Sequence, residues 1–282
     1  MNFRFFFSKI ISLIPFFPFK ISIIRRIYNP DKIFHGKYKN VEKIIKINQA
    51  KFLCNTSSYI EWGMIFFKGH EIALLRFFQN LIKSNNFNLF LDIGANIGYF
   101  SLPISYKIET LSFEPFPNNF EKLNINCSIN NSNIKTYNFG LSNKNKREKI
   151  FFSNNSPNLG NISLSPDKYF NLDKFKIINL KIFDDYFDYF GQNILIKIDT
   201  EGHELNVLKG MKKILKNNNC FIYIECISEE TVTFFKKINY NYFFIKDDLY
   251  NVITLSDNFN GHVIASNYSF HNSLMNFAGT PK

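Results

Sequence analysis

The feature that most constrains the fold is a short apolar strand that runs into a glycine turn and then into a helix. Residues 88–93 end in Leu-Asp-Ile, and Gly94 and Gly98 follow within the pattern D-x-G-x-x-x-G. A short apolar run without polar alternation is typical of a strand buried on both faces of a sheet. Because helices cover both faces of such a sheet, the pattern favours the α/β class.

The chain after residue 60 continues this alternation of strands and helices. Buried strands are expected at 110–113, 134–139, 193–198 and 221–225, with helices at 69–84, 118–130, 204–217 and 229–238. The stretch from about 143 to 190 is rich in Asn, Ser and Lys, which indicates an irregular insertion, with strand-like pieces at 149–153 and 177–183. We therefore expect residues 53–282 to form one α/β domain that carries this insertion.

The basic charge of the chain is concentrated at its N-terminus. The whole chain has a net charge of +11, and residues 1–52 contribute eleven Lys and Arg residues against two acidic ones, or +9. A basic chain suggests a nucleic-acid-binding protein, but here the main domain carries only +2. We expect residues 1–52 to be a basic, aromatic-rich extension of that domain.

The first part of this extension is apolar as well as basic. Residues 10–19 form its longest stretch without charge and contain Pro15 and Pro18. This is too short for a membrane-spanning helix, which needs about 20 apolar residues. Residues 1–30 are therefore either an interfacial anchor on an anionic membrane surface or a helix packed on its own domain or on a partner subunit.

The glycine turn also indicates the charge of its ligand. A dinucleotide site has the spacing G-x-G-x-x-G and holds a phosphate over the helix N-terminus. Here Asp92 directly precedes the turn and would repel an anion. S-adenosylmethionine, which carries an ammonium and a sulfonium, is a better match, and an ordinary strand–glycine–helix turn without a ligand is the alternative.

A second acidic residue strengthens the nucleoside interpretation. Glu114 ends the next strand, about 20 residues after the glycine turn. An acid at that point accepts the ribose hydroxyls of a bound nucleoside. Its alternative role is to cap the helix that follows Pro115.

Charged residues crowd the end of the strand at 193–198, within the sequence Lys197-Ile-Asp-Thr-Glu-Gly-His-Glu204. Alternation places Lys197 and Asp199 on one face of the strand, and buried charges are costly unless they are used or paired. His203 is a candidate general base, with Asp199 or Glu201 to orient it or to bind a substrate hydroxyl. A divalent metal between Asp199, Glu201 and Glu225 is a chemical alternative, but their spacing is not that of a dedicated metal site, so no metal is expected.

Together these motifs resemble the FkbM family of S-adenosylmethionine-dependent methyltransferases. The resemblance rests on 92–100, on Phe113-Glu114-Pro115 with Asn118 and Asn119, on 140–142, on Phe183-Asp184, on 197–204, on 207–210 and on Ile224-Glu225. It covers about residues 60–245 and implies a Rossmann-like class I methyltransferase fold. Such a fold has a mostly parallel, seven-stranded sheet with helices on both faces.

The resemblance also implies roles for individual residues. The residues that it places against the cofactor are Asp92, Gly94, Asn96, Gly98 and Glu114, with Asn118 and Leu141 near the adenosine. The acceptor would meet Asp199, Glu201 and His203. The family commonly methylates sugar hydroxyls, but its motifs do not fix which residue is the base.

We therefore expect an S-adenosylmethionine-dependent O-methyltransferase that acts on a sugar hydroxyl of a cell-surface glycan or a lipid-linked precursor. The expected partner is a carbohydrate or glycolipid acceptor and not a nucleic acid. The expected location is the cytoplasm, with peripheral attachment to the inner face of the membrane as an option. The alternative is a nucleic-acid methyltransferase or a nucleic-acid-binding protein, which would bind with a steep dependence on salt.

Overall fold

The computed structural model describes residues 2–15, 19–69, 71–153, 162–164, 174–225, 228–240, 242–246, 252–254 and 262–267. Parts of the expected insertion, 154–161 and 165–173, lie outside these residues, as does the end of the chain from 268.

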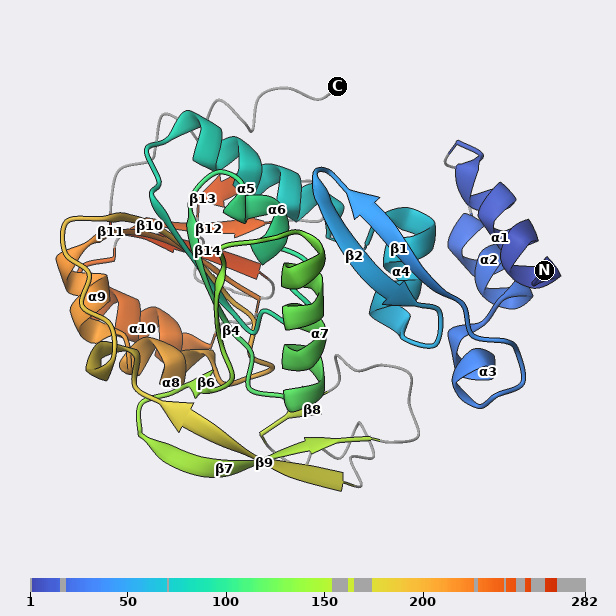
Figure 1. The fold of residues 1–282 in the computed structure, drawn as a ribbon. Helices are drawn as coiled ribbons and strands as arrows, with labels where there is room; N and C mark the ends of the chain where they lie inside the picture. The colour runs from blue at the N-terminus through green and yellow to red at the C-terminus, as the bar shows by residue number, and fades with distance from the viewer. Residues whose placement is uncertain are drawn as a thin grey trace.

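An eight-stranded sheet forms the centre of the molecule, in the order β13-β12-β14-β11-β10-β3-β4-β5 (Figure 1). Five neighbouring strands are parallel: β11 (Asn219–Ile224), β10 (Asn193–Ile198), β3 (Leu89–Ile93), β4 (Glu109–Phe113) and β5 (Lys135–Tyr137). The other three pair antiparallel at one edge: β14 (His262–Ser266), β12 (Tyr242–Lys246) and β13 (Val252–Thr254). The predicted α/β class is confirmed, with eight strands instead of seven and parallel pairing confined to five.

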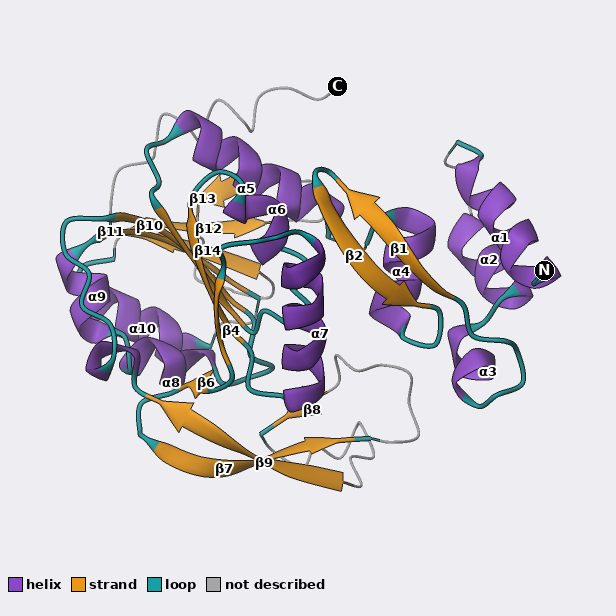
Figure 2. Cartoon of the chain, viewed as in Figure 1, coloured by secondary structure: helices purple, strands orange, loops and turns teal. Residues whose placement is uncertain are grey.

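Helices cover both faces of this sheet, as Figure 2 shows. One face carries α5 (Ile72–Ser84), α6 (Ser101–Ser105) and α7 (Pro117–Ile129), and the other carries α8 (Glu204–Lys209), α9 (Lys212–Asn217) and α10 (Glu229–Lys237). Alternate strand residues feed the two cores: Leu195 packs in the first, and Ile194 and Ile196 pack in the second. This double burial explains why the central strands are apolar without alternation.

The single helix expected at 204–217 is two helices, because the chain turns between α8 and α9. A Cβ on Gly210 would lie 2.0 Å from the carbonyl oxygen of Ser142, so the turn packs against that backbone. The N-terminus of α9 is capped by Asp184, whose carboxylate accepts the backbone N–H groups of Lys213 and Ile214 at 2.7 and 3.2 Å. Asp184 belongs to the 3-10 turn Phe183–Asp185. This contact gives the Phe183-Asp184 motif a structural role.

A second, four-stranded sheet forms from the segment expected to be irregular. Its order is β6-β9-β7-β8, with β6 (Gly140–Leu141), β9 (Lys174–Lys181), β7 (Lys146–Phe152) and β8 (Ile162–Ser163). The long antiparallel pair of β7 and β9 lies below the carboxyl edge of the main sheet in Figure 1.

The N-terminal region consists of α1 (Phe3–Leu13), α2 (Lys20–Ile27), α3 (Pro30–Phe34), the hairpin of β1 (Glu42–Ile47) and β2 (Ala50–Asn55), and α4 (Tyr59–Phe67). The backbone N–H groups of Lys51 and Leu53 donate to Asn130 and Asn126 of α7 at 2.8 and 2.9 Å. The expected division at residue 52 thus falls inside β2, and the core of this region continues into that of the α5 face. Within the described part of the chain, no helix has the length and apolarity needed to cross a membrane.

Candidate active site

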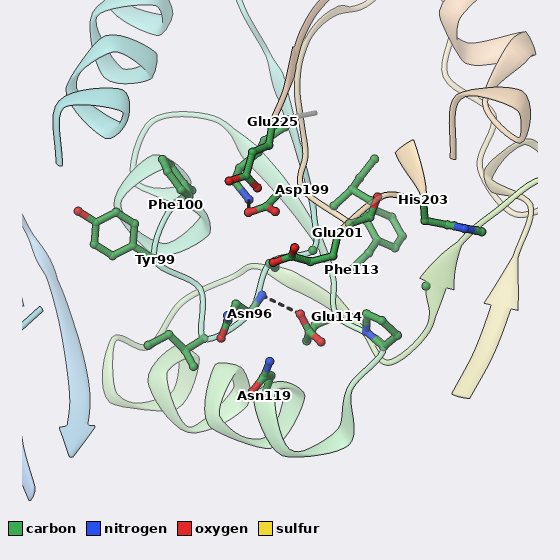
Figure 3. A pocket seen from close by; sticks show the side chains of 18 of the residues that line it. Asn96, Tyr99, Phe100, Phe113, Glu114, Asn119, Asp199, Glu201, His203 and Glu225 are labelled. Atoms are coloured by element: carbon green, nitrogen blue, oxygen red, sulfur yellow. Dashed lines mark hydrogen bonds and ion pairs between the residues drawn. The ribbon is translucent and has the colours of Figure 1, made fainter. Parts of the chain in front are cut away.

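A cavity of about 260 Å³ opens at the carboxyl ends of β3, β4, β10 and β11 (Figure 3). Its walls come from the loops that follow these strands, from α4 and from β6, β7 and β9. In open α/β sheets, ligands bind at this edge. The cavity therefore lies where the sequence motifs predict a site.

The glycine turn holds two strand ends together. Gly94 has a φ of +80°, and a Cβ at this position would lie 1.8 Å from the carbonyl oxygen of Asp199. Gly98 has a φ of +87°, and its Cβ would lie 2.7 Å from the side chain of Leu123. Both glycines are needed for packing within the protein, and Gly98 is outside the cavity wall.

Glu114 lies buried between two backbone donors. Its Oε2 accepts the N–H of Asn96 at 2.8 Å, and its Oε1 accepts the N–H of Phe116 at 2.8 Å. Burial raises the pKa of Glu114 to about 7, against the effect of these two hydrogen bonds. Each carboxylate oxygen keeps a lone pair, so Glu114 can also accept two hydroxyl groups from a ligand in the cavity.

Asp92 is fully buried beneath the cavity. Its Oδ2 accepts the hydroxyl of Ser101 at 2.5 Å, while its Oδ1 has no hydrogen bond and lies 3.8 Å from Nζ of Lys197. Burial raises the pKa of Asp92, and Lys197 acts in the opposite direction. Asp92 therefore does not line the cavity. It contacts Lys197, and Lys197 lines the cavity.

Lys197 connects two carboxylates, since its Nζ also lies 2.9 Å from Oδ2 of Asp199. Burial lowers the pKa of Lys197, but Asp199 and Asp92 outweigh it and raise this pKa overall. A hydrogen bond to Asp199, together with burial, raises the pKa of Glu225 to about 9. At neutral pH, Glu225 is therefore largely protonated, and it shares this proton with Asp199.

Glu201 projects into the same part of the cavity (Figure 3). Its φ of +52° is unusual for a residue with a side chain. Glu204 supports this turn, because its Oε1 accepts the N–H groups of Thr200 and Gly202 at 3.2 and 3.1 Å. Partial desolvation of its carboxyl group at the cavity, followed by the charge of Asp199, raises the pKa of Glu201 to about 7, although the residue as a whole is exposed.

His203 points away from these three carboxylates (Figure 3). Its Nε2 lies 3.0 Å from the hydroxyl of Ser142, and its Nδ1 lies 3.3 Å from the amide nitrogen of Asn206. Burial and the charge of Lys146 lower the pKa of His203. Both ring nitrogens are thus engaged, one with Ser142 after β6 and one with Asn206 of α8, although the ring borders the cavity.

The family model for the methyltransferase FkbM domain matches residues 92–247, which is more than half of the chain. This match begins at Asp92 and includes Glu114, Asp199 and Glu225. The chain belongs to the FkbM methyltransferase family. S-adenosylmethionine is accordingly its methyl donor.

The cavity of this FkbM methyltransferase fits that cofactor. The two oxygens of Glu114 can accept ribose hydroxyls, and the acidic side chains of Asp199 and Glu201 favour a cationic centre. Apolar side chains line the remainder, including Leu141, Ile150, Ile178 and Leu180. Among the described residues, no group of three or more His, Cys, Asp or Glu side chains is arranged to hold a metal ion.

The FkbM methyltransferase resembles one curated protein and several solved structures. Hexuronic acid methyltransferase AglP of Haloferax volcanii is 30% identical over 144 residues, which cover 48% of this chain and 54% of that protein. The chain thus spans about half the length of this relative.

Two solved structures show lower identity. Methyltransferase FkbM from Methylobacillus flagellatus KT is 18% identical, with a TM-score of 0.42 over 64% of this chain and 44% of that one. The tRNA (uracil-54, C5)-methyltransferase of Pyrococcus abyssi, solved with S-adenosyl-L-homocysteine, is 13% identical, with a TM-score of 0.42 over 80% and 43% of the two chains.

The structure brings most of the predicted site residues together. Gly94, Asn96, Glu114, Leu141, Asp199, Glu201 and His203 line the cavity. Asn118 instead borders a smaller cavity, and its Oδ1 accepts a hydrogen bond from Nζ of Lys176 at 2.6 Å. Its neighbour Asn119 lines the main cavity in its place. Sequence reasoning missed the α4 residues Ile60 and Met64, because nothing in their pattern places α4 over the strand ends.

Proposed function

We propose that this protein is an O-methyltransferase that acts on a sugar hydroxyl of a cell-surface glycan or lipid-linked precursor. The observation that carries the proposal is the cluster of Asp199, Glu201 and Glu225 in one part of the cavity. A polyhydroxyl acceptor suits this cluster, because ionised carboxylates accept hydroxyl hydrogen bonds and a protonated one donates. The partial likeness to a hexuronic acid methyltransferase supports a glycan acceptor.

Glu201 is our candidate for the general base. When bound, S-adenosylmethionine would supply the methyl group: the acceptor oxygen would bond to the methyl carbon as the S–CH3 bond breaks and S-adenosylhomocysteine leaves, and the hydroxyl proton would pass to Glu201. A base works best when its pKa is near the working pH, and burial raises that of Glu201 to about 7. His203, the base favoured by its residue type, has both ring nitrogens engaged with Ser142 and Asn206. Glu201 therefore replaces His203 in this role.

Asp199 and Glu225 have a different part in the proposed reaction. Lys197 lies 2.9 Å from Oδ2 of Asp199 and favours its carboxylate form, so Asp199 accepts a hydrogen bond from the acceptor and holds its position. Fixing two reactants in place supplies much of the rate of such a transfer. We also propose that a lipid-linked acceptor brings the enzyme to the cytoplasmic face of a membrane.

The experiment that tests this function identifies the chemical group that receives the methyl. The purified protein is incubated with S-adenosylmethionine labelled in its methyl group and an envelope extract of the host that contains its glycans and lipids. We expect label in the carbohydrate fraction, released by hydriodic acid as methyl iodide, which marks an O-methyl ether. Label in RNA, DNA or protein, or on nitrogen, would contradict the proposal. The matched control is a protein with Glu114→Gln, in which cofactor binding is impaired and labelling falls.

A further inference from the structure

Helix α1 exposes an entire apolar face. Six large apolar side chains recur on it at helical spacing and are all exposed: Phe3, Phe6, Phe7, Ile10, Leu13 and Ile14. Phe3 and Leu13 are 68% and 76% exposed, so nothing in the described chain covers either end of this face. Phe19 before α2 is 79% exposed and extends the same apolar character. We refer to the six α1 residues as the α1 face.

The opposite side of α1 is firmly attached to the protein. The ring of Phe5 lies 5.8 Å from that of Tyr28 and 5.7 Å from that of Phe66. Nζ of Lys9 donates to the carbonyl oxygen of Ile65 at 2.6 Å, and Ser8 is fully buried. The α1 face is therefore the outer side of a docked helix and is not a displaced core surface.

The charge around this helix identifies the kind of partner. Residues 1–52 carry +9, and the exposed basic residues of the first 40 are Arg4, Arg25, Arg26, Lys32, Lys37 and Lys39. A second copy of this chain would bring an equal positive charge against it and would be repelled. An anionic lipid surface attracts each such charge and also accepts the apolar side chains.

We propose that the α1 face binds an anionic phospholipid bilayer, with α1 lying in the plane of the interface. An 11-residue helix is about 16 Å long, so it is suited to lie along a bilayer surface and not to cross it. Phe3, Phe7 and Leu13 enter the boundary between headgroups and acyl chains, and the exposed Arg26 of α2 meets the headgroups.

Helix α4 links this face to the active site. Ile60 and Met64 of α4 line the cavity, while Ile65 and Phe66 of the same helix contact α1. A bilayer bound to α1 therefore lies one helix away from the cavity wall. The binding of lipid stands independently of the proposed function, but the delivery of a lipid-linked acceptor to the cavity rests on it.

Vesicle flotation of the full chain tests the proposal. The vesicles contain phosphatidylcholine with or without phosphatidylglycerol, and they carry neither glycan nor cofactor. Leu13→Glu should lower binding to anionic vesicles about tenfold, and Arg26→Ala should lower it about fivefold. Phe190→Glu is the matched control, because Phe190 is also 76% exposed but lies far from α1 in the chain. All three variants should keep the thermal unfolding midpoint of the wild type.

The outcomes separate the occupants of this face. Weaker binding in Leu13→Glu with unchanged binding in Phe190→Glu supports the proposal. Equal binding of these two variants, or no binding of the wild type to anionic vesicles, overturns it. A dimer in sedimentation that Leu13→Glu dissociates, without vesicle binding, would assign the face to a second copy. None of these failures affects the labelling test of methyl transfer.

Discussion

Replacing Glu114 with glutamine should weaken cofactor binding while the fold survives. Glutamine has nearly the same shape, but only one of its two terminal atoms accepts a hydrogen bond. Its amide nitrogen would face either the N–H of Asn96 or that of Phe116, which now donate to the carboxylate at 2.8 Å. One ribose hydroxyl would also lose a charged acceptor.

The size of the effect follows from these lost contacts. A hydrogen bond to a charged group contributes about 1.5–3 kcal/mol. With part of this recovered by the glutamine oxygen, we expect a loss of about 2–4 kcal/mol, or about 30- to 1,000-fold in Kd. Isothermal titration calorimetry with S-adenosylhomocysteine measures it directly.

The pH dependence of the same measurement provides a second check. The pKa of Glu114 is about 7 in the free protein, and accepting two hydroxyls requires the ionised form. Below pH 7 the proton must leave before the ligand binds, so affinity should fall by up to about tenfold per pH unit as the pH decreases. Above pH 7, Glu114 is already ionised, so its titration should no longer change the affinity. Glu114→Gln should remove the slope.

The matched control is Glu109→Gln, at the opposite end of the same strand. Glu109 is exposed and pairs with Lys135 at 2.6 Å on the surface. This variant should bind S-adenosylhomocysteine as the wild type does. If Glu114→Gln binds within threefold of Glu109→Gln, the assignment of Glu114 to the ribose is refuted.

Two further predictions concern the glycine turn and the carboxylate cluster. Gly94→Ala should lower the free energy of unfolding by about 3 kcal/mol or more in urea denaturation, because its Cβ would lie 1.8 Å from the carbonyl oxygen of Asp199. Gly191→Ala also has a positive φ, of +67°, but has nothing within 4 Å, so it should cost about 1 kcal/mol, and equal losses would contradict the packing argument. Turnover of the wild type should fall above pH 9, where Glu225 loses the proton that it shares with Asp199. Glu225→Gln keeps a donor and should abolish that fall, and a fall that persists in this variant would exclude Glu225 as its source.

Much of the fold could be predicted from the sequence, because buried parallel strands leave a strong local pattern. The runs at 88–93, 193–198 and 221–225 are β3, β10 and β11 within one or two residues. The antiparallel edge of the sheet was harder to predict from the sequence, because short strands such as β13 find their pairing partners only in the tertiary structure. The break between α8 and α9 depends on contact with the backbone of Ser142, which no local pattern reports.

The residues of the site could likewise be predicted only in part. Strand ends meet at one edge of a parallel sheet, so Glu114 and Asp199 could be placed at the cavity from sequence order alone. The directions of the side chains could not be predicted from the sequence. The residue type of His203 therefore suggested a general base, although its ring points toward Ser142. The raised pKa of Glu201 depends on burial and on the charge of Asp199, which only the assembled fold supplies.

The most direct test of the account is the rate of methyl transfer to the envelope extract by the wild type, Glu201→Gln and His203→Gln. We expect Glu201→Gln to lower kcat by about 10²–10⁴-fold and to leave the affinity for S-adenosylhomocysteine unchanged. We also expect the kcat of His203→Gln to stay within about threefold of the wild-type value, because the proton of the acceptor hydroxyl passes to the carboxylate of Glu201. The wild-type rate should rise with pH up to about 7, the pKa of Glu201, and stay level from there to about pH 9. Near-normal turnover in Glu201→Gln, or a comparable loss in His203→Gln alone, would contradict the assignment of the base.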